Sequence, residues 1–124
     1  MKYISLKMFT IYLAVLLSLI VIGSAKAQNP CGNDEICVVQ FNAGFNEANK
    51  VDWVEKLGDC ETSFIDIGVD KDAPKTYKIV VVPTIVIFVG GEEQARFQAN
   101  IMMQMEATKK DVQNKIDEII MESF

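Results

Sequence analysis

The sequence predicts an α/β fold with a central mixed sheet of about four strands, and three observations lead to it. Two strand-like apolar runs, 36–41 and 62–67, are separated by a helix-like segment, which predicts parallel strands joined by a crossover. A third run, 84–89, passes through Gly90-Gly91 into an alternating segment, which predicts an antiparallel hairpin. Helix-spaced apolar residues close the chain. The predicted order is therefore strand, helix, strand, helix, strand, strand, helix (β-α-β-α-β-β-α).

The start of the 124-residue chain is predicted to be a signal peptide, 1–27. Its apolar run, 8–22, follows two lysines and falls short of the ~18 to 20 residues that a membrane-spanning helix needs. Ala25 and Ala27 then supply a small-x-small cleavage pattern. We therefore expect one domain, 28–124, that is periplasmic or secreted and has no membrane contact after cleavage. An uncleaved membrane anchor is the alternative.

Composition argues against several kinds of partner and site. Residues 28–124 hold all 17 acidic residues and nine of the 12 basic ones, which gives a formal charge of −8. Nucleic acid and anionic membrane surfaces are therefore poor partners. The chain has no His and no Cys-x-x-Cys, so we expect no zinc site and predict no cofactor.

Three cysteines, Cys31, Cys37 and Cys60, would lie in a compartment where disulfides persist. An odd number indicates one bridge and one free or intermolecular thiol. Cys31 and Cys37 are closest in sequence and are the first candidate pair, while a pairing with Cys60 stays open. Cys37 and Cys60 should both lie at the amino ends of parallel strands, whereas ligand chemistry in open α/β sheets gathers at the carboxyl ends. We therefore favour a structural bridge over a catalytic one.

The segment after the first strand predicts a tight turn and a short helix. The chain turns through Ala43-Gly44, Asn46 is placed to cap the helix, and Glu47 suits the positive end of its dipole. Gly58 is a natural stop. The apolar face of this helix would consist of Ala48, Val51, Val54 and Leu57.

The middle of the chain contains a proline inside an apolar run. The polar connection 70–77 before it has room for one or two helical turns, with Asp70 or Asp72 as cap. Pro83 cannot donate to a strand ladder, so the strand should begin at Thr84, with Pro83 at its entrance.

The last segments predict an edge strand and a helix. Alternation over 94–99 places Ala95, Phe97 and Ala99 on one face. Thr108 is placed to cap the final helix. The apolar stripe of that helix consists of Val112, Ile116, Ile119 and Ile120.

The stretch "DIGVDKDAPKTYKIVVVPTIVIFVGGEEQARF", 66–97, resembles the second half of the thioredoxin family: a strand, an Asp-rich connection, a Val-Pro-Thr and an edge hairpin. The likeness extends over 36–124. It implies a thioredoxin-like fold that is truncated at the N-terminus, because the family's opening strand and helix have no room here. It also implies that Pro83 is a cis-proline.

On the family pattern, Phe45 takes the place of a Trp, and Asn46 and Asn49 take the places of the two redox cysteines. A carboxamide has neither a titratable proton nor a nucleophilic sulfur, so Asn46 cannot form a mixed disulfide. Gln40 and Phe64 stand where the family usually has a buried Asp and often has a Lys. We therefore expect no catalytic residue, and the capping of a helix is the simplest role for Asn46.

The resemblance also implies a binding site, since relatives pair an extended peptide with backbone beside the cis-proline. Here Val82, Pro83 and Thr84 would do so, with Phe45 as an apolar neighbour. We therefore expect a redox-inactive domain that binds a protein or extended peptide noncovalently.

Two rival functions stay open. One is a thiol-disulfide oxidoreductase that acts through a noncanonical cysteine such as Cys60. The other is Cu(I) binding by the thioethers of Met102, Met103 and Met105, although methionines more often fill gaps in packing.

Overall fold

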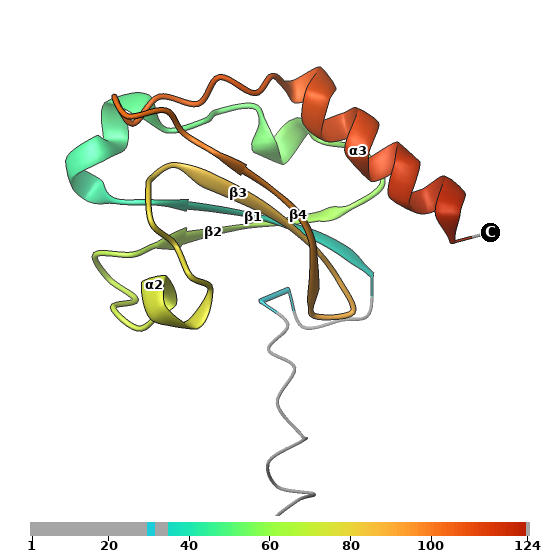
Figure 1. Cartoon of the computed structure of the whole chain (residues 1–124), viewed down its shortest axis with the longest axis horizontal. Coiled ribbons are helices and arrows are strands. Elements are labelled where there is room, and N and C mark those ends of the chain that lie inside the picture. Colours follow the sequence, from blue (N-terminus) through green and yellow to red (C-terminus); the bar gives the residue numbers. More distant parts are fainter. Residues whose placement is uncertain (1–29, 32–34, 124) are drawn as a thin grey trace, which may run out of the picture.

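The computed structural model describes residues 30–31 and 35–123. The predicted signal peptide, 1–27, lies outside the described residues. In the described part of the chain, no helix has the length and apolar character needed to cross a membrane. The described residues form one mixed sheet with helices and turns on both faces (Figure 1).

The sheet has the strand order β2-β1-β3-β4. β1 is central and pairs in parallel with β2 and antiparallel with β3, and β3 pairs antiparallel with β4. The predicted mixed sheet of four strands is thus confirmed, and the parallel pair confirms the expected crossover. The strands are β1 (Ile36–Asn42), β2 (Glu61–Asp66), β3 (Thr84–Val89) and β4 (Glu92–Gln98).

One face of the sheet is covered by the long C-terminal helix α3 (Lys109–Glu122). Val112 and Ile116 of the predicted stripe are fully buried against the sheet, and Ile119 and Ile120 are partly buried there. Thr108 caps the helix as predicted, in a reciprocal capping box with Asp111 that satisfies two backbone amides.

The opposite face is covered by a single helical turn, α2 (Ala73–Thr76). Asp72 occupies its N-cap position, but its side chain makes no capping bond, and the Asp70 carboxylate accepts the Asp72 amide instead. The ring of Tyr77, which follows α2, lies 5.1 Å from that of Phe41 and 5.8 Å from that of Phe88. These aromatic contacts hold the short helix on the sheet.

The hairpin between β3 and β4 forms as predicted. Gly90 and Gly91 both have positive φ, 59° and 83°, the backbone conformation that glycine adopts without steric cost. β3 begins at Thr84, directly after Pro83, and the Val82-Pro83 peptide bond is cis. Both expectations for this region are confirmed.

The prediction of a short helix after β1 is wrong. Two separate 3₁₀ turns take its place, η1 (Gly44–Asn49) and η2 (Val54–Lys56). The cause lies in Gln40: its side chain donates to the carbonyl of Val51 and accepts from the amide of Val51, each at 2.8 Å. Both backbone groups of Val51 are therefore paired with a side chain, which replaces the bonds that would carry a helix through this point.

The predicted apolar face survives this change in part. Val51, Val54 and Leu57 are buried against the sheet on the α3 side, whereas Ala48 is exposed. The predicted face is therefore correct at Val51, Val54 and Leu57, wrong at Ala48, and wrong in backbone conformation.

Candidate functional site

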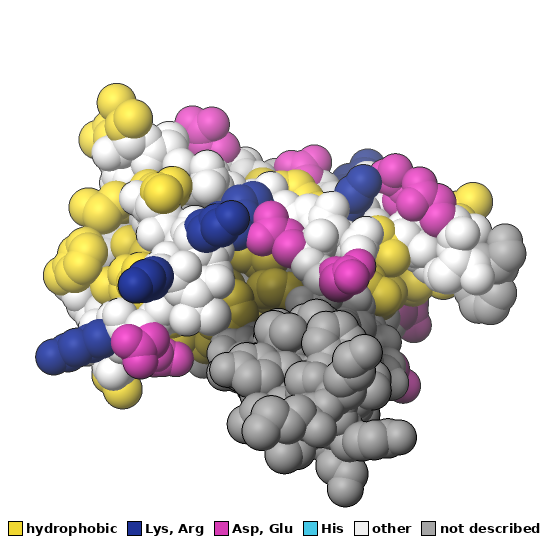
Figure 2. Space-filling model, turned by 60° about the horizontal axis from the view of Figure 1, so that its bottom comes forward, with side chains coloured by type: hydrophobic (Ala, Val, Ile, Leu, Met, Phe, Trp, Pro, Cys, Tyr) yellow, Lys and Arg dark blue, Asp and Glu magenta, His cyan; other side chains and the backbone are white. Residues whose placement is uncertain are grey.

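An apolar groove of about 210 Å³ lies at the carboxyl ends of β1 and β2. Its walls come from η1, the end of β2, the loop that enters β3, and the loop between β4 and α3. Figure 2 shows hydrophobic side chains gathered at this end of the molecule, where Figure 1 places η1 and the loop into β3. The lining residues are Phe45, Ile67, Ile79, Val80, Val81, Val82 and Met103.

Several large apolar side chains at this end face solvent. Phe45 is 79% exposed and Val80 is 81% exposed. The loop that contributes Met103 to the groove also carries Ile101 and Met102, which are both exposed. Scattered exposed apolar residues are normal, but a contiguous set around a groove is typical of an interaction site.

At this end of the molecule, Asn46 is buried and only 4% exposed. Its amide nitrogen lies 3.2 Å from the Asn42 Oδ1, 3.3 Å from the Val82 carbonyl oxygen and 3.1 Å from the Met103 carbonyl oxygen. A carboxamide has two N–H hydrogens, so these three acceptors share them. One side chain thus joins the end of β1, the loop before the cis-proline and the loop after β4.

The other atoms of the network are also paired. The Asn46 Oδ1 accepts from the side chain of Asn49 at 2.8 Å, and the side chain of Asn42 donates to the Asn46 carbonyl at 3.2 Å. The predicted capping role of Asn46 is wrong: Ala43 precedes η1, and no side chain caps that turn. The φ and ψ of Asn46, −114° and 23°, break the turn and let its side chain point inward.

The backbone around the cis-proline is only partly available to a ligand. Pro83 and Thr84 are buried; the Pro83 carbonyl accepts from the Ala99 amide at 3.0 Å, and the Thr84 hydroxyl donates to the Val81 carbonyl at 2.6 Å. The Val82 amide donates no hydrogen bond to any described residue. Val82 is itself only 4% exposed, so the accessible side chains at this end are those of Phe45, Val80 and Val81.

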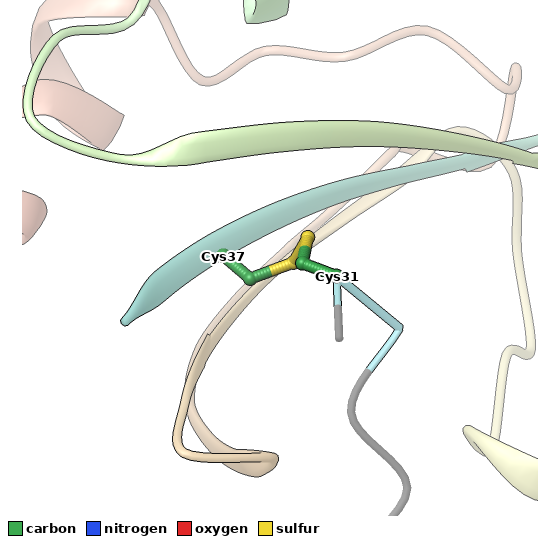
Figure 3. The surroundings of a disulfide bond; sticks show 2 residues. All are labelled: Cys31 and Cys37. Atoms are coloured by element: carbon green, nitrogen blue, oxygen red, sulfur yellow. A yellow bond between two sulfur atoms is a disulfide. The ribbon is translucent and has the colours of Figure 1, made fainter. Parts of the chain in front are cut away.

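The cysteine sulfur atoms lie away from this groove. Cys31 and Cys37 form a disulfide at the amino end of β1, with their Cα atoms 5.9 Å apart (Figure 3), which confirms the first candidate pair. Cys60 is the free cysteine of the described residues and directly precedes β2. Burial, and secondarily the negative charge of Asp59, raise the pKa of the Cys60 thiol above its ordinary value. A raised pKa leaves less of the nucleophilic thiolate at neutral pH.

The three methionines of the proposed copper motif have different surroundings. Met103 packs against the core on the α2 face of the sheet, and Met105 packs against the core on the α3 face. Met102 is exposed. Packing, the alternative to metal binding, therefore describes two of the three. Among the described residues, no group of three or more His, Cys, Asp or Glu side chains is placed to hold a metal ion.

Sequence reasoning missed two parts of the site. Ile79, Val80 and Val81 belong to the apolar run before Pro83, which was placed outside the strand, and the groove wall that they form was not recognised. Asn42 was counted as the residue after a strand, although its side chain anchors the Asn46 network. The sequence does contain a signal for the pairing of Asn42 with Asn46, because the two residues are four positions apart across a tight turn and both carry side-chain amides.

Comparison with known proteins supports the fold. A scan of family models finds no match to the chain, and a search of curated proteins finds none. Among solved structures, the chain is similar to a mutant thioredoxin from Halobacterium salinarum, with a TM-score of 0.55, 18% identity, and coverage of 68% of this chain and 74% of that one.

Two further thioredoxins give the same result. The Fasciola hepatica protein has a TM-score of 0.52 at 24% identity, with coverage of 69% of this chain and 82% of that one. The protein from Nicotiana alata has a TM-score of 0.52 at 20% identity, with coverage of 70% and 75%. At such identities the likeness shows the fold alone: this is a thioredoxin-like α/β domain.

Proposed function

We propose that this thioredoxin-like domain acts outside the cytoplasm as a noncovalent binding module, and that its groove holds an extended apolar segment of another protein. The observation that carries the proposal is the groove itself, where the exposed ring of Phe45 lies beside the exposed Val80 and the half-buried Val81. The Val82 amide, which donates to no described residue, would donate one backbone hydrogen bond to such a segment.

The amide network supports binding without redox chemistry. Asn46 occupies the position of a redox cysteine on the family pattern, and its polar atoms are all engaged with protein groups. The network fixes the loop before the cis-proline relative to η1, so the two walls of the groove are positioned before a ligand arrives. Such preorganisation lowers the entropy cost of binding.

The disulfide supports a location outside the cytoplasm. Cys31 and Cys37 are bridged, and disulfides of this structural kind persist in oxidising compartments and are rare in the cytosol. The predicted signal peptide agrees with such a location.

The test uses a permanently unfolded probe, the reduced and alkylated B chain of insulin, labelled for fluorescence anisotropy. We expect saturable binding that weakens on the order of tenfold in Phe45→Ser, because the ring no longer leaves water on binding. The matched control is Met121→Ser, which removes an equally exposed apolar side chain from α3 and should leave the affinity unchanged.

Two results would overturn the proposal. One is equal affinity of the wild-type protein and Phe45→Ser for the probe. The other is catalytic reduction of intact insulin by the purified protein, abolished by Cys60→Ser, which would favour the oxidoreductase alternative.

A further inference from the structure

The outer edge of β2 is a second, separate feature of the surface. β2 ends the strand order of the sheet, and no described strand pairs with its outer side (Figure 1). Edge strands present backbone donors and acceptors that can pair with another chain, and natural proteins usually cover or blunt them.

The hydrogen-bond register identifies which residues of β2 face outward. The amide of Ile67, just after β2, donates to the carbonyl of Asn42 at 2.9 Å, so the backbone groups of Ile67 point toward β1. Backbone direction alternates along a strand, which directs Ser63 and Ile65 toward β1 and Thr62 and Phe64 outward.

The same alternation explains where the open edge ends. Asp66 also faces outward, and its carbonyl accepts the amides of Val69 and Asp70 at 3.1 and 2.9 Å in the following turn. That turn closes one end of the edge. The amides of Thr62 and Phe64 make no hydrogen bond with any described residue, which leaves two donors and two carbonyl acceptors for an added strand.

A cleft of about 510 Å³ runs beside this edge, between β2 and the segment that holds η1 and η2. It exists because two short turns, and not a full helix, cover this part of the sheet. Thr62 and Phe64 line it, and the ring of Phe64 is 40% exposed with the Lys50 ammonium 4.5 Å from its centre. An added strand would therefore meet an aromatic contact as well as backbone partners.

The charged side chains that line the cleft indicate which kind of segment would bind beside β2. The cleft is lined by three carboxylates, Glu47, Asp52 and Glu55, against the single ammonium of Lys50. None of the three carboxylates forms an ion pair with a described residue. A second copy of the chain would bring the same carboxylates to the edge and be repelled, whereas basic side chains would be attracted.

We propose that the edge of β2 binds an extended, basic segment of a partner protein by strand addition, with Thr62 and Phe64 supplying the backbone bonds. Basic side chains of the partner lie in the cleft beside Glu47, Asp52 and Glu55. This site is independent of the groove at Phe45, and neither proposal rests on the other.

The direct test is amide hydrogen exchange by NMR on the full chain. The probe is a short labelled peptide in which Val and Thr alternate between terminal lysine pairs; its counterpart carries Glu in place of each Lys. We expect the amides of Thr62 and Phe64 to exchange fast in the free protein and slowly with the basic peptide. The amides of Ser63 and Ile65 should be protected in both states, because they face β1.

Variants separate the backbone and charge contributions. Thr62→Pro removes an outward amide and spares the β1 ladder, and it should weaken peptide affinity on the order of tenfold. Its control is Gln98→Pro on the opposite edge strand, where the residue is also exposed. If Thr62→Pro fails to fold, the double variant Glu47→Lys and Glu55→Lys should weaken binding similarly, and Glu92→Lys with Glu122→Lys should not.

Three outcomes would overturn the proposal. The first is fast exchange of Thr62 and Phe64 at saturating basic peptide. The second is equal binding of the acidic peptide. The third is protection of these two amides without any peptide, which shows self-association if it rises with protein concentration and coverage by the chain itself if it does not.

Discussion

The two ends of β1 are held in place by different kinds of interaction. At the amino end, Cys37 is covalently bonded to Cys31. At the carboxyl end, Asn42 belongs to a network of carboxamides that includes Asn46 and reaches the loop before the cis-proline. In open α/β sheets the carboxyl ends of strands are where ligand chemistry gathers. Here the carboxyl end contains the carboxamides and the amino end contains the disulfide.

This difference shows how carboxamides alone can hold the corner at the carboxyl end of β1. A buried polar side chain is tolerated only when its atoms are paired, and every polar atom of Asn46 has a partner. The Asn46 amide therefore forms a structural connection between three segments. The comparison leads to three further predictions, in order of decreasing effect.

The largest effect should come from Asn46→Ala. The change leaves the Asn42 Oδ1 and the carbonyl oxygens of Val82 and Met103 without their buried donor, and each unsatisfied group costs about 1 to 3 kcal/mol. We expect a loss of about 2 to 4 kcal/mol in the free energy of unfolding, measured by urea denaturation. Asn49→Ala, which removes one half-buried bond, should cost about 1 kcal/mol.

That prediction also tests the link between the network and the groove. If Asn46→Ala unfolds at the same urea concentration as the wild-type protein, the network does not stabilise the corner and the comparison fails. If stability falls as expected, affinity for the unfolded insulin B chain should fall with it at temperatures where the variant is still folded, because the two groove walls are no longer fixed.

The next effect should come from the opposite end. Replacing both Cys31 and Cys37 by Ala removes a bridge that closes a loop with a sequence separation of 6. Such a small loop corresponds to roughly 2 kcal/mol of stabilisation in the chain-entropy account. We expect that loss in urea denaturation, and a matching loss when the wild-type protein is reduced. Affinity at the Phe45 groove should stay unchanged, because the bridge lies at the other end of β1. A large fall in affinity would contradict the separation of the two ends.

Most of the fold could be predicted from the sequence because its signals are local. Pro83 excludes a strand before Thr84, Gly90 and Gly91 supply the positive φ of a hairpin, and Thr108 caps a helix whose apolar residues recur every three or four positions. Each of these rules depends on a few adjacent residues. The structure confirms all three.

The corner after β1 could not be predicted in the same way. Gln40 and Val51 are 11 residues apart, and their paired bonds end the helix that the local pattern favours. Asn46 and Val82 are 36 residues apart, and only the assembled fold brings them together. Helix propensity and capping preference are weak signals that such tertiary bonds override. The site is built by hydrogen bonds between residues far apart in the sequence. The sequence pattern shows the individual residues but not which of them pair.

The smallest effect should come from Cys60. Its side chain is half-buried against the core on the α3 face, and its raised pKa has burial as the main cause. Cys60→Ser should change stability at pH 7 by less than about 1 kcal/mol and leave binding of the insulin B chain unchanged. Alkylation by iodoacetamide should be slower at pH 7 than that of an ordinary thiol, and its rate should level off only above the ordinary thiol value of 9.0, because thiolate is the reacting form.

The raised pKa of Cys60 also predicts how folding stability depends on pH, which gives a second measurement on the same thiol. Since folding raises its pKa, the folded chain keeps the proton at a pH where the unfolded chain has released it. The stability that the Cys60 thiol contributes is therefore fully present below the pKa that it has in the unfolded chain. That stability is lost as the pH rises through the pKa that it has in the folded chain. The wild-type protein should lose stability relative to Cys60→Ser between those two values. Fast alkylation at pH 7 would instead identify a reactive thiol at the amino end of β2 and return the oxidoreductase alternative to consideration.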